Sequence, residues 1–346
     1  MFPRLGRAVI AVLAGAVPLS GCYLMESAAG QMEITNEQRP ITQLIDDPDT
    51  SPALRRELTR VHEIREFASS DLKLPDNGSY KSYADVERRY VVWNVFAAPE
   101  FSVDPKTWCF PFVGCVAYRG YFDEVEAQGY AYRLKSEGYD VIVGGVAAYS
   151  TLGHFHDPVL NTMLEWDESE LAGIIFHELA HQLLYVPGDS AFNEAFATTV
   201  EHEGVRRWLA RVGRATEEKD YAARAERARE VASLVGAART RLRALYASGQ
   251  NPAEMRAAKA AEFDRLRAEY AALPGSEYGY SWLFGPDLNN AALSSVATYY
   301  DCVPGFEARL KAVDGDLPRF YAAARALAGE PADQRRKQLC GAGSDQ

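Results

Sequence analysis

The chain has 346 residues, of which 47% are hydrophobic and 25% charged, with a net charge of −11 at pH 7. This composition is that of a globular protein, long enough for two subdomains or for one large catalytic unit. The acidic balance argues against a nucleic-acid partner, because phosphate binding needs concentrated lysine and arginine.

The N-terminus carries the parts of a secretory signal. Arg4 and Arg7 precede an apolar run over 8–19, which at roughly a dozen residues is too short to span a membrane. The sequence Leu19-Ser20-Gly21-Cys22 resembles a bacterial lipobox, which implies removal of a 1–21 signal peptide and acylation of Cys22. An ordinary signal peptide with an incidental cysteine is the alternative. We therefore expect an exported protein, lipid-anchored to a bacterial membrane and facing the periplasm.

The remaining cysteines form an even set if Cys22 is acylated. In an exported protein this predicts two disulfides. Local pairing would join Cys109 to Cys115, and Cys302 to Cys340 across the C-terminal segment. A zinc ribbon is the alternative, but neither the spacing nor a nearby histidine favours it.

The first half of the chain mixes helix and strand signals. Apolar residues recur every three or four positions from 51 to about 70, which predicts an amphipathic helix. A stretch rich in Tyr, Trp and Pro follows, with strands predicted at 90–96 and 115–122. A helix at 123–137 and a strand at 140–149 complete this part.

Helix signals dominate the second half. Helices are predicted at about 167–185 and 190–212, and a last helical region at about 288–328. The region 216–273 is dense in Ala, Arg and Glu and contains no strand signal. It predicts a long helical hairpin, broken at 248–252, whose charges lie in solvent.

The run His177-Glu178-Leu179-Ala180-His181 is the strongest chemical signal in the sequence. Two histidines four residues apart lie on one helix face, so both imidazoles can reach one ion. Glu178 projects beside that face, where it can take a proton from a water activated by the metal. The alternative is a core helix whose histidines are satisfied by hydrogen bonds.

The segment 193–201 supplies a third ligand. It resembles the ligand-bearing helix of gluzincin peptidases, the thermolysin-like and zinc-aminopeptidase groups, and this resemblance implies that Glu194 completes the site. Glu201 competes, because its spacing after His181 is closer to the usual gluzincin spacing. If the helices fold back near residue 187, Glu194 lies across from His181, and Glu201 lies ~10 Å further along the helix. We therefore expect Glu194 to bind the ion and Glu201 to orient a histidine or a substrate amine.

Two histidines, a glutamate and a water would form an open, catalytic site for one zinc ion. The predicted reaction is peptide hydrolysis, in which zinc polarises the carbonyl and Glu178 moves the proton from water to the leaving amine. A further donor should stabilise the oxyanion, and comparable enzymes often place it in the C-terminal part. Besides His202, the candidates are Tyr278, Tyr280, Tyr299 and Tyr300. We take Tyr299 as the predicted donor.

The whole chain also resembles a family of bacterial lipoproteins catalogued as predicted aminopeptidases. The likeness runs from the lipobox to past Cys302 and includes the segments 76–80, 108–111, 114–122, 149–153, 176–182 and 192–194. It implies a lipid-anchored zinc peptidase of the gluzincin kind that acts on peptides in the periplasm. Established zinc aminopeptidases carry a Gly-x-Met-Glu-Asn run whose acid grips the substrate amine, and this sequence has no such run. An envelope endopeptidase and a non-catalytic zinc-containing scaffold are therefore the alternatives.

These signals together predict an α+β fold, a gluzincin-like domain with a small β-rich N-terminal part and a mostly helical C-terminal part. The expected divisions are a signal peptide at 1–21, a lipid-anchored segment at 22–50, a zinc-binding catalytic region at 51–212 and a helical region at 213–346.

Overall fold

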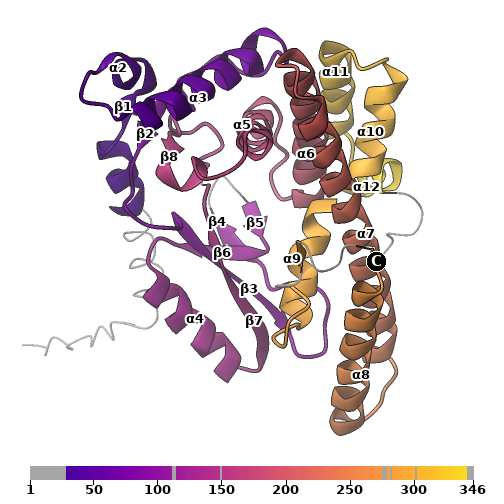
Figure 1. The fold of residues 1–346 in the computed structure, drawn as a ribbon. Coiled ribbons are helices and arrows are strands. Elements are labelled where there is room, and N and C mark those ends of the chain that lie inside the picture. Colours follow the sequence, from indigo (N-terminus) through magenta and orange to yellow (C-terminus); the bar gives the residue numbers. More distant parts are fainter. Residues whose placement is uncertain are drawn as a thin grey trace, which may run out of the picture.

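The structure is a computed structural model (Figure 1). It describes residues 29–110, 114–148, 150–274, 279–280, 283–300 and 302–340. The signal segment, Cys22 and Tyr278 lie outside the described residues, and so do the side chains of 297–300, which include Tyr299. Within the described part, no helix has both the length and the apolar character needed to cross a membrane.

The described chain is a mixed α+β structure in which helices predominate, and this confirms the predicted class. Residues 29–36 are helical and precede the first labelled elements. The labelled helices are α2 (Ile41–Asp46), α3 (Pro52–Ser70), α4 (Glu124–Ser136), the single turn η1 (Asn161–Met163), α5 (Glu168–Leu183), α6 (Ser190–Arg211), α7 (Ala215–Tyr246), α8 (Pro252–Ala271), α9 (Asn290–Tyr300), α10 (Val303–Ala312), α11 (Leu317–Ala328) and α12 (Ala332–Leu339).

The strands form three small sheets. The largest has the order β6 (Tyr118–Tyr121), β3 (Val92–Pro99), β7 (Tyr139–Val146), and both of its pairings are antiparallel. The others are the sheet β1 (Arg39–Pro40), β2 (Ser82–Ala84), β8 (Val159–Leu160) and the pair β4 (Trp108–Phe110), β5 (Gly114–Val116).

The largest sheet separates a packed face from an open one. Because side chains alternate along a strand, Val95 and Ala97 of β3 face α4 and pack with its Ala131. The intervening residues Asn94 and Phe96 face a cleft on the other side. The sheet therefore forms one wall of that cleft.

The main core joins the N-terminal half to the last helices. Phe176 of α5 and Phe196 of α6 are fully buried in it, together with Phe306 of α10 and Phe320 of α11. The Phe196 ring lies 5.7 Å from that of Phe306 and 5.8 Å from that of Phe320, measured between centroids. Helices α10 and α11 therefore pack against α6 through these rings.

Helices α7 and α8 lie side by side and project from the rest of the molecule (Figure 1). They share a second, smaller core with α9, to which Val235 and Leu242 of α7 and Leu266 of α8 contribute. Arg241 contacts Glu262 and Glu269 beside this core. We call α7 and α8 the helical pair.

One predicted strand differs from those observed, and one predicted helical region is divided into separate helices. The strand expected at 115–122 is divided between β5 and β6, because β5 pairs with β4 and β6 pairs with β3. The helical region expected at 288–328 consists of the three helices α9, α10 and α11. Pro304 stands in the first turn of α10, where proline is tolerated, and Gly315 adopts a positive φ of 75° between α10 and α11.

The described residues form two disulfides. One joins Cys109 to Cys115, which lie opposite each other in β4 and β5. The other joins Cys302, at the start of α10, to Cys340, at the end of α12.

Candidate metal centre

The helix α5 presents both motif histidines to the cleft because its other faces are buried. Asp167 caps its N-terminus by accepting a hydrogen bond from the amide of Glu170. Phe176 and Leu179 are fully buried in the main core. His177 and His181 line the cleft, with 12% and 6% of their side chains exposed.

The turn before α6 places Glu194 opposite these histidines. The buried Asn193 side chain accepts a hydrogen bond from the amide of Val186 at 2.7 Å and donates one to its carbonyl at 2.9 Å. Asp189 caps α6 through the amide of Phe192 and also contacts Arg335 of α12. The asparagine therefore fixes the turn, so the adjacent Glu194 faces α5.

Three side chains converge at this point. The Nε2 atoms of His177 and His181 lie 3.1 Å apart. The Glu194 carboxylate approaches the first at 3.3 Å and the second at 3.7 Å. The structure therefore brings together the three predicted ligands, whose donor atoms all lie within 4.8 Å of one another.

This arrangement fits a small divalent cation. Ligand atoms each 2.0–2.1 Å from a tetrahedral zinc ion lie about 3.3 Å from one another, close to the observed separations. Burial alone would lower the pKa of His177, but hydrogen bonds to Glu194 and Glu201 raise it well above its usual value. Burial lowers the pKa of His181 to about 4. The two glutamates thus favour a positive charge at His177, and a bound metal ion would displace the proton that otherwise supplies it.

Glu201 lies behind His177 on α6. Its Oε2 is 3.0 Å from His177 Nδ1, and its Oε1 accepts a hydrogen bond of 2.8 Å from the hydroxyl of Tyr221. A histidine that binds metal through Nε2 carries its proton on Nδ1 and donates it to such a partner. The position of Glu201 therefore corresponds to the orienting role expected from the sequence.

Glu178 shares the cleft with the histidines. Burial raises the pKa of its carboxyl to about 7, and the negative charge of Glu194 acts in the same direction, while the charge of His177 and a hydrogen bond with Ser150 oppose the rise. A carboxyl with that pKa can accept and return a proton near neutral pH.

The cleft between the β6-β3-β7 sheet and helices α5 and α6 has a volume of about 840 Å³. Its lining is largely aliphatic and aromatic and includes Val92, Phe96, Val116, Phe122, Leu152 and Phe155. The segment after β7 is held at its rim, because Asp157 accepts hydrogen bonds from the amide and hydroxyl of Thr151. An extended apolar peptide segment could occupy this space.

Of the predicted oxyanion donors, the two whose side chains the structure describes, Tyr280 and His202, do not line this cleft. Tyr280 packs against the second core, and His202 contacts Glu307 outside the cleft, while the Tyr299 side chain lies outside the described residues. Tyr118 and Tyr185 do line the cleft, and the Tyr185 ring lies 6.2 Å from that of His181. Sequence reasoning missed both, because a tyrosine-rich chain gives no local signal for the ones that face the site.

Comparison with known proteins identifies a family. A family model described as "Putative aminopeptidase" matches residues 22–339, and this confirms the resemblance expected from the sequence. Neither a curated protein nor a solved structure matches the chain.

Proposed function

We propose that this chain, which belongs to that aminopeptidase family, is a zinc-dependent peptidase. The observation that carries the proposal is the convergence of His177, His181 and Glu194 beside Glu178 in one cleft. Zinc bound there would polarise the scissile carbonyl and activate a water molecule. An open site with three protein ligands and a neighbouring base is typical of catalytic rather than structural zinc.

The protein's own groups supply the proton transfers. Glu178 would take a proton from the attacking water and deliver it to the leaving amine. Its carboxyl suits both steps, because burial has brought its pKa to about 7. Glu201 would hold His177 in one orientation through the contact at Nδ1.

The proposed setting is the periplasmic face of a bacterial membrane. It follows from the basic N-terminus and from Leu19-Ser20-Gly21-Cys22, which would direct export and acylation of Cys22. Two disulfides are in keeping with an oxidising compartment. A gluzincin-like domain is part of the same proposal and is supported by the Asn193-Glu194 pair that follows the His-Glu-x-x-His helix.

A second candidate is an endopeptidase. The acidic residues among the described residues that line the cleft are Glu178, Glu194 and Glu201. Glu194 faces both histidines, and both oxygens of Glu201 are engaged by His177 and Tyr221. Glu178 is the proposed base, so none of these three described carboxylates remains to bind a substrate α-amine, which favours a peptidase that tolerates a blocked N-terminus.

The test combines metal analysis with peptide cleavage. The purified protein should contain one zinc ion and cleave peptides, and Glu178→Gln should keep the zinc while losing about 10²–10⁴-fold in activity. Parallel libraries with free and acetylated N-termini separate the two candidates, since an aminopeptidase cleaves only the first. A wild-type protein without zinc would refute the proposal, and zinc without cleavage of any peptide would favour a scaffold.

A further inference from the structure

Tyr221 lies on α7, in the region that the sequence assigned to a solvated structural hairpin. Its hydroxyl donates a hydrogen bond of 2.8 Å to Glu201, whose other oxygen lies 3.0 Å from His177. Three helices thus meet in one chain of contacts that leads from α7 through α6 to a predicted metal ligand on α5.

The carboxylate between them is partly buried and is contacted on both sides. Glu201 exposes 24% of its side chain. Gly173 of α5 provides the space for it, since a Cβ at that position would lie 3.2 Å from Glu201 Oε1. With one oxygen facing His177 and the other facing Tyr221, the carboxylate has little freedom to rotate.

Contacts on both sides of Tyr221 hold the start of α7 against the N-terminal end of α5. Before Tyr221, Arg214 contacts Glu168 of α5 at 2.9 Å. After it, Arg224 donates hydrogen bonds to Asp167 at 3.1 Å and to Ser169 at 2.6 Å. The position of the Tyr221 hydroxyl is therefore set relative to α5, the helix that carries His177.

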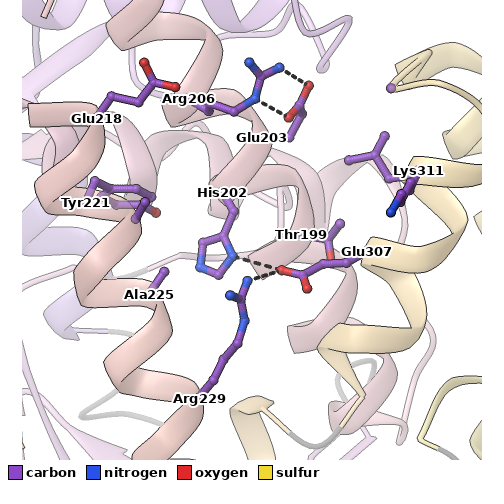
Figure 2. Close-up of a pocket in the computed structure, with 13 residues that line it drawn as sticks. Thr199, His202, Glu203, Arg206, Glu218, Tyr221, Ala225, Arg229, Glu307 and Lys311 are labelled. Carbon is purple, nitrogen blue, oxygen red and sulfur yellow. Dashed lines mark hydrogen bonds and ion pairs between the residues drawn. The ribbon is translucent and has the colours of Figure 1, made fainter. Parts of the chain in front are cut away.

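The ring of Tyr221 packs against His202 and lines a cavity. Figure 2 shows it on α7 beside His202 of α6, and the two ring centroids are 6.0 Å apart, edge to face. The ring lines a second cavity of about 440 Å³, which Glu307 and Lys311 of α10 also line (Figure 2). Loss of the hydroxyl alone should leave the ring in this setting.

From these contacts we infer that Tyr221 is a positioning residue for the metal centre. Its hydroxyl fixes the Glu201 carboxylate and so fixes the orientation of His177 and the proton on Nδ1. The inference rests on the proposed function, because it assumes that His177 binds metal through Nε2. Contacts of this kind behind a metal ligand typically contribute 10–100-fold to metal affinity or activity.

The experiment compares Tyr221→Phe with Tyr246→Phe in the purified full-length protein. Tyr246 lies at the other end of the same helix, and its hydroxyl donates to Asn290 at 2.9 Å, so the control removes an equivalent hydrogen bond far from the metal. Zinc affinity is measured by competition with a chromophoric chelator, ligand geometry by the visible spectrum of the Co²⁺-loaded protein, and fold stability by Tm.

We expect Tyr221→Phe to weaken zinc binding about tenfold and to shift the Co²⁺ spectrum, while Tyr246→Phe does neither. In a Glu201→Ala background the Tyr221 substitution should have no further effect, because the side chain through which it is inferred to act is absent. Equal zinc affinity in the two phenylalanine variants, or an undiminished effect in the Glu201→Ala background, would overturn the inference.

The outcomes also separate this inference from the proposed function. A wild-type protein that binds zinc but cleaves no peptide would refute the peptidase proposal alone, and the affinity comparison would still decide the role of Tyr221. A wild-type protein that binds neither zinc nor cobalt would refute both.

Discussion

The α5–α6 unit and the helical pair are built from the same parts and differ in what they bury. Each consists of two consecutive helices joined by a short connection, residues 184–189 in the first and 247–251 in the second. Between α7 and α8 the buried residues are mainly apolar, and Arg241 makes its ion pairs beside that seam. Between α5 and α6 lie His177, His181 and two glutamates.

Burying polar groups costs free energy unless each one finds a partner. The helical pair avoids the cost by the usual separation of apolar seam and charged surface. The α5–α6 unit does bury polar groups, and these groups contact one another and converge on a common point. This difference supports placing the proposed chemistry in the α5–α6 unit, although the helical pair is the longer one.

The largest expected effect is in the α5–α6 unit. Glu194→Ala removes one of three ligands and should weaken zinc binding by more than about 100-fold, since even the contacts behind ligands contribute 10–100-fold. Zinc content after dialysis and chelator competition would measure it. Glu203→Ala is the control, because this glutamate lies on the same helix but contacts Arg206 and Arg207. Full zinc retention in Glu194→Ala would move the third ligand to Glu201.

An intermediate effect is expected where the two units meet. Glu307 of α10 contacts His202 of α6 and Arg229 of α7 (Figure 2). Burial alone would raise the pKa of the Glu307 carboxyl, but the neighbouring His202 and the charge of Arg229 hold it below its usual value. The Glu307 carboxyl therefore binds a proton more weakly in the folded chain than in the unfolded chain. Its ionised form stabilises the fold at neutral pH, and this contribution is lost as the pH falls below about 4.

Glu307→Gln should consequently lower the free energy of unfolding by about 1 kcal/mol at pH 7 and by less at pH 3.5. Urea titrations at both pH values would show whether the difference in the free energy of unfolding between wild type and Glu307→Gln becomes smaller at pH 3.5. Glu226→Gln removes an exposed partner of the same arginine and should change stability less. If the difference in the free energy of unfolding between wild type and Glu307→Gln stays constant with pH, the charge of Glu307 does not contribute to stability.

The smallest effect is expected within the helical pair. Arg241→Ala removes two ion pairs that lie partly in solvent, and such pairs contribute about 1 kcal/mol or less. Tm should fall by no more than about 3 °C, with zinc content and peptidase activity unchanged. A loss of zinc in this variant would show that the two units are more closely coupled than their separate cores imply.

Local spacing along the chain was enough to predict part of the candidate site. His177, Glu178 and His181 share a helix, so their relative positions follow from 3.6 residues per turn. The short turn after α5 limits which residue of α6 can face them, and Glu194 is the one that does. The α+β class followed in the same way, because apolar periodicity and turn residues mark each element separately.

Contacts between separate elements could not be predicted from spacing along the chain. Glu201 meets Tyr221 through packing between α6 and α7, and nothing near residue 221 in the sequence marks its hydroxyl as a partner of that carboxylate. The wall of the cleft is likewise set by which face of β3 packs on α4. Contacts of this kind depend on the relative placement of separate helices and sheets, which is fixed by burial of many side chains at once and not by any local pattern.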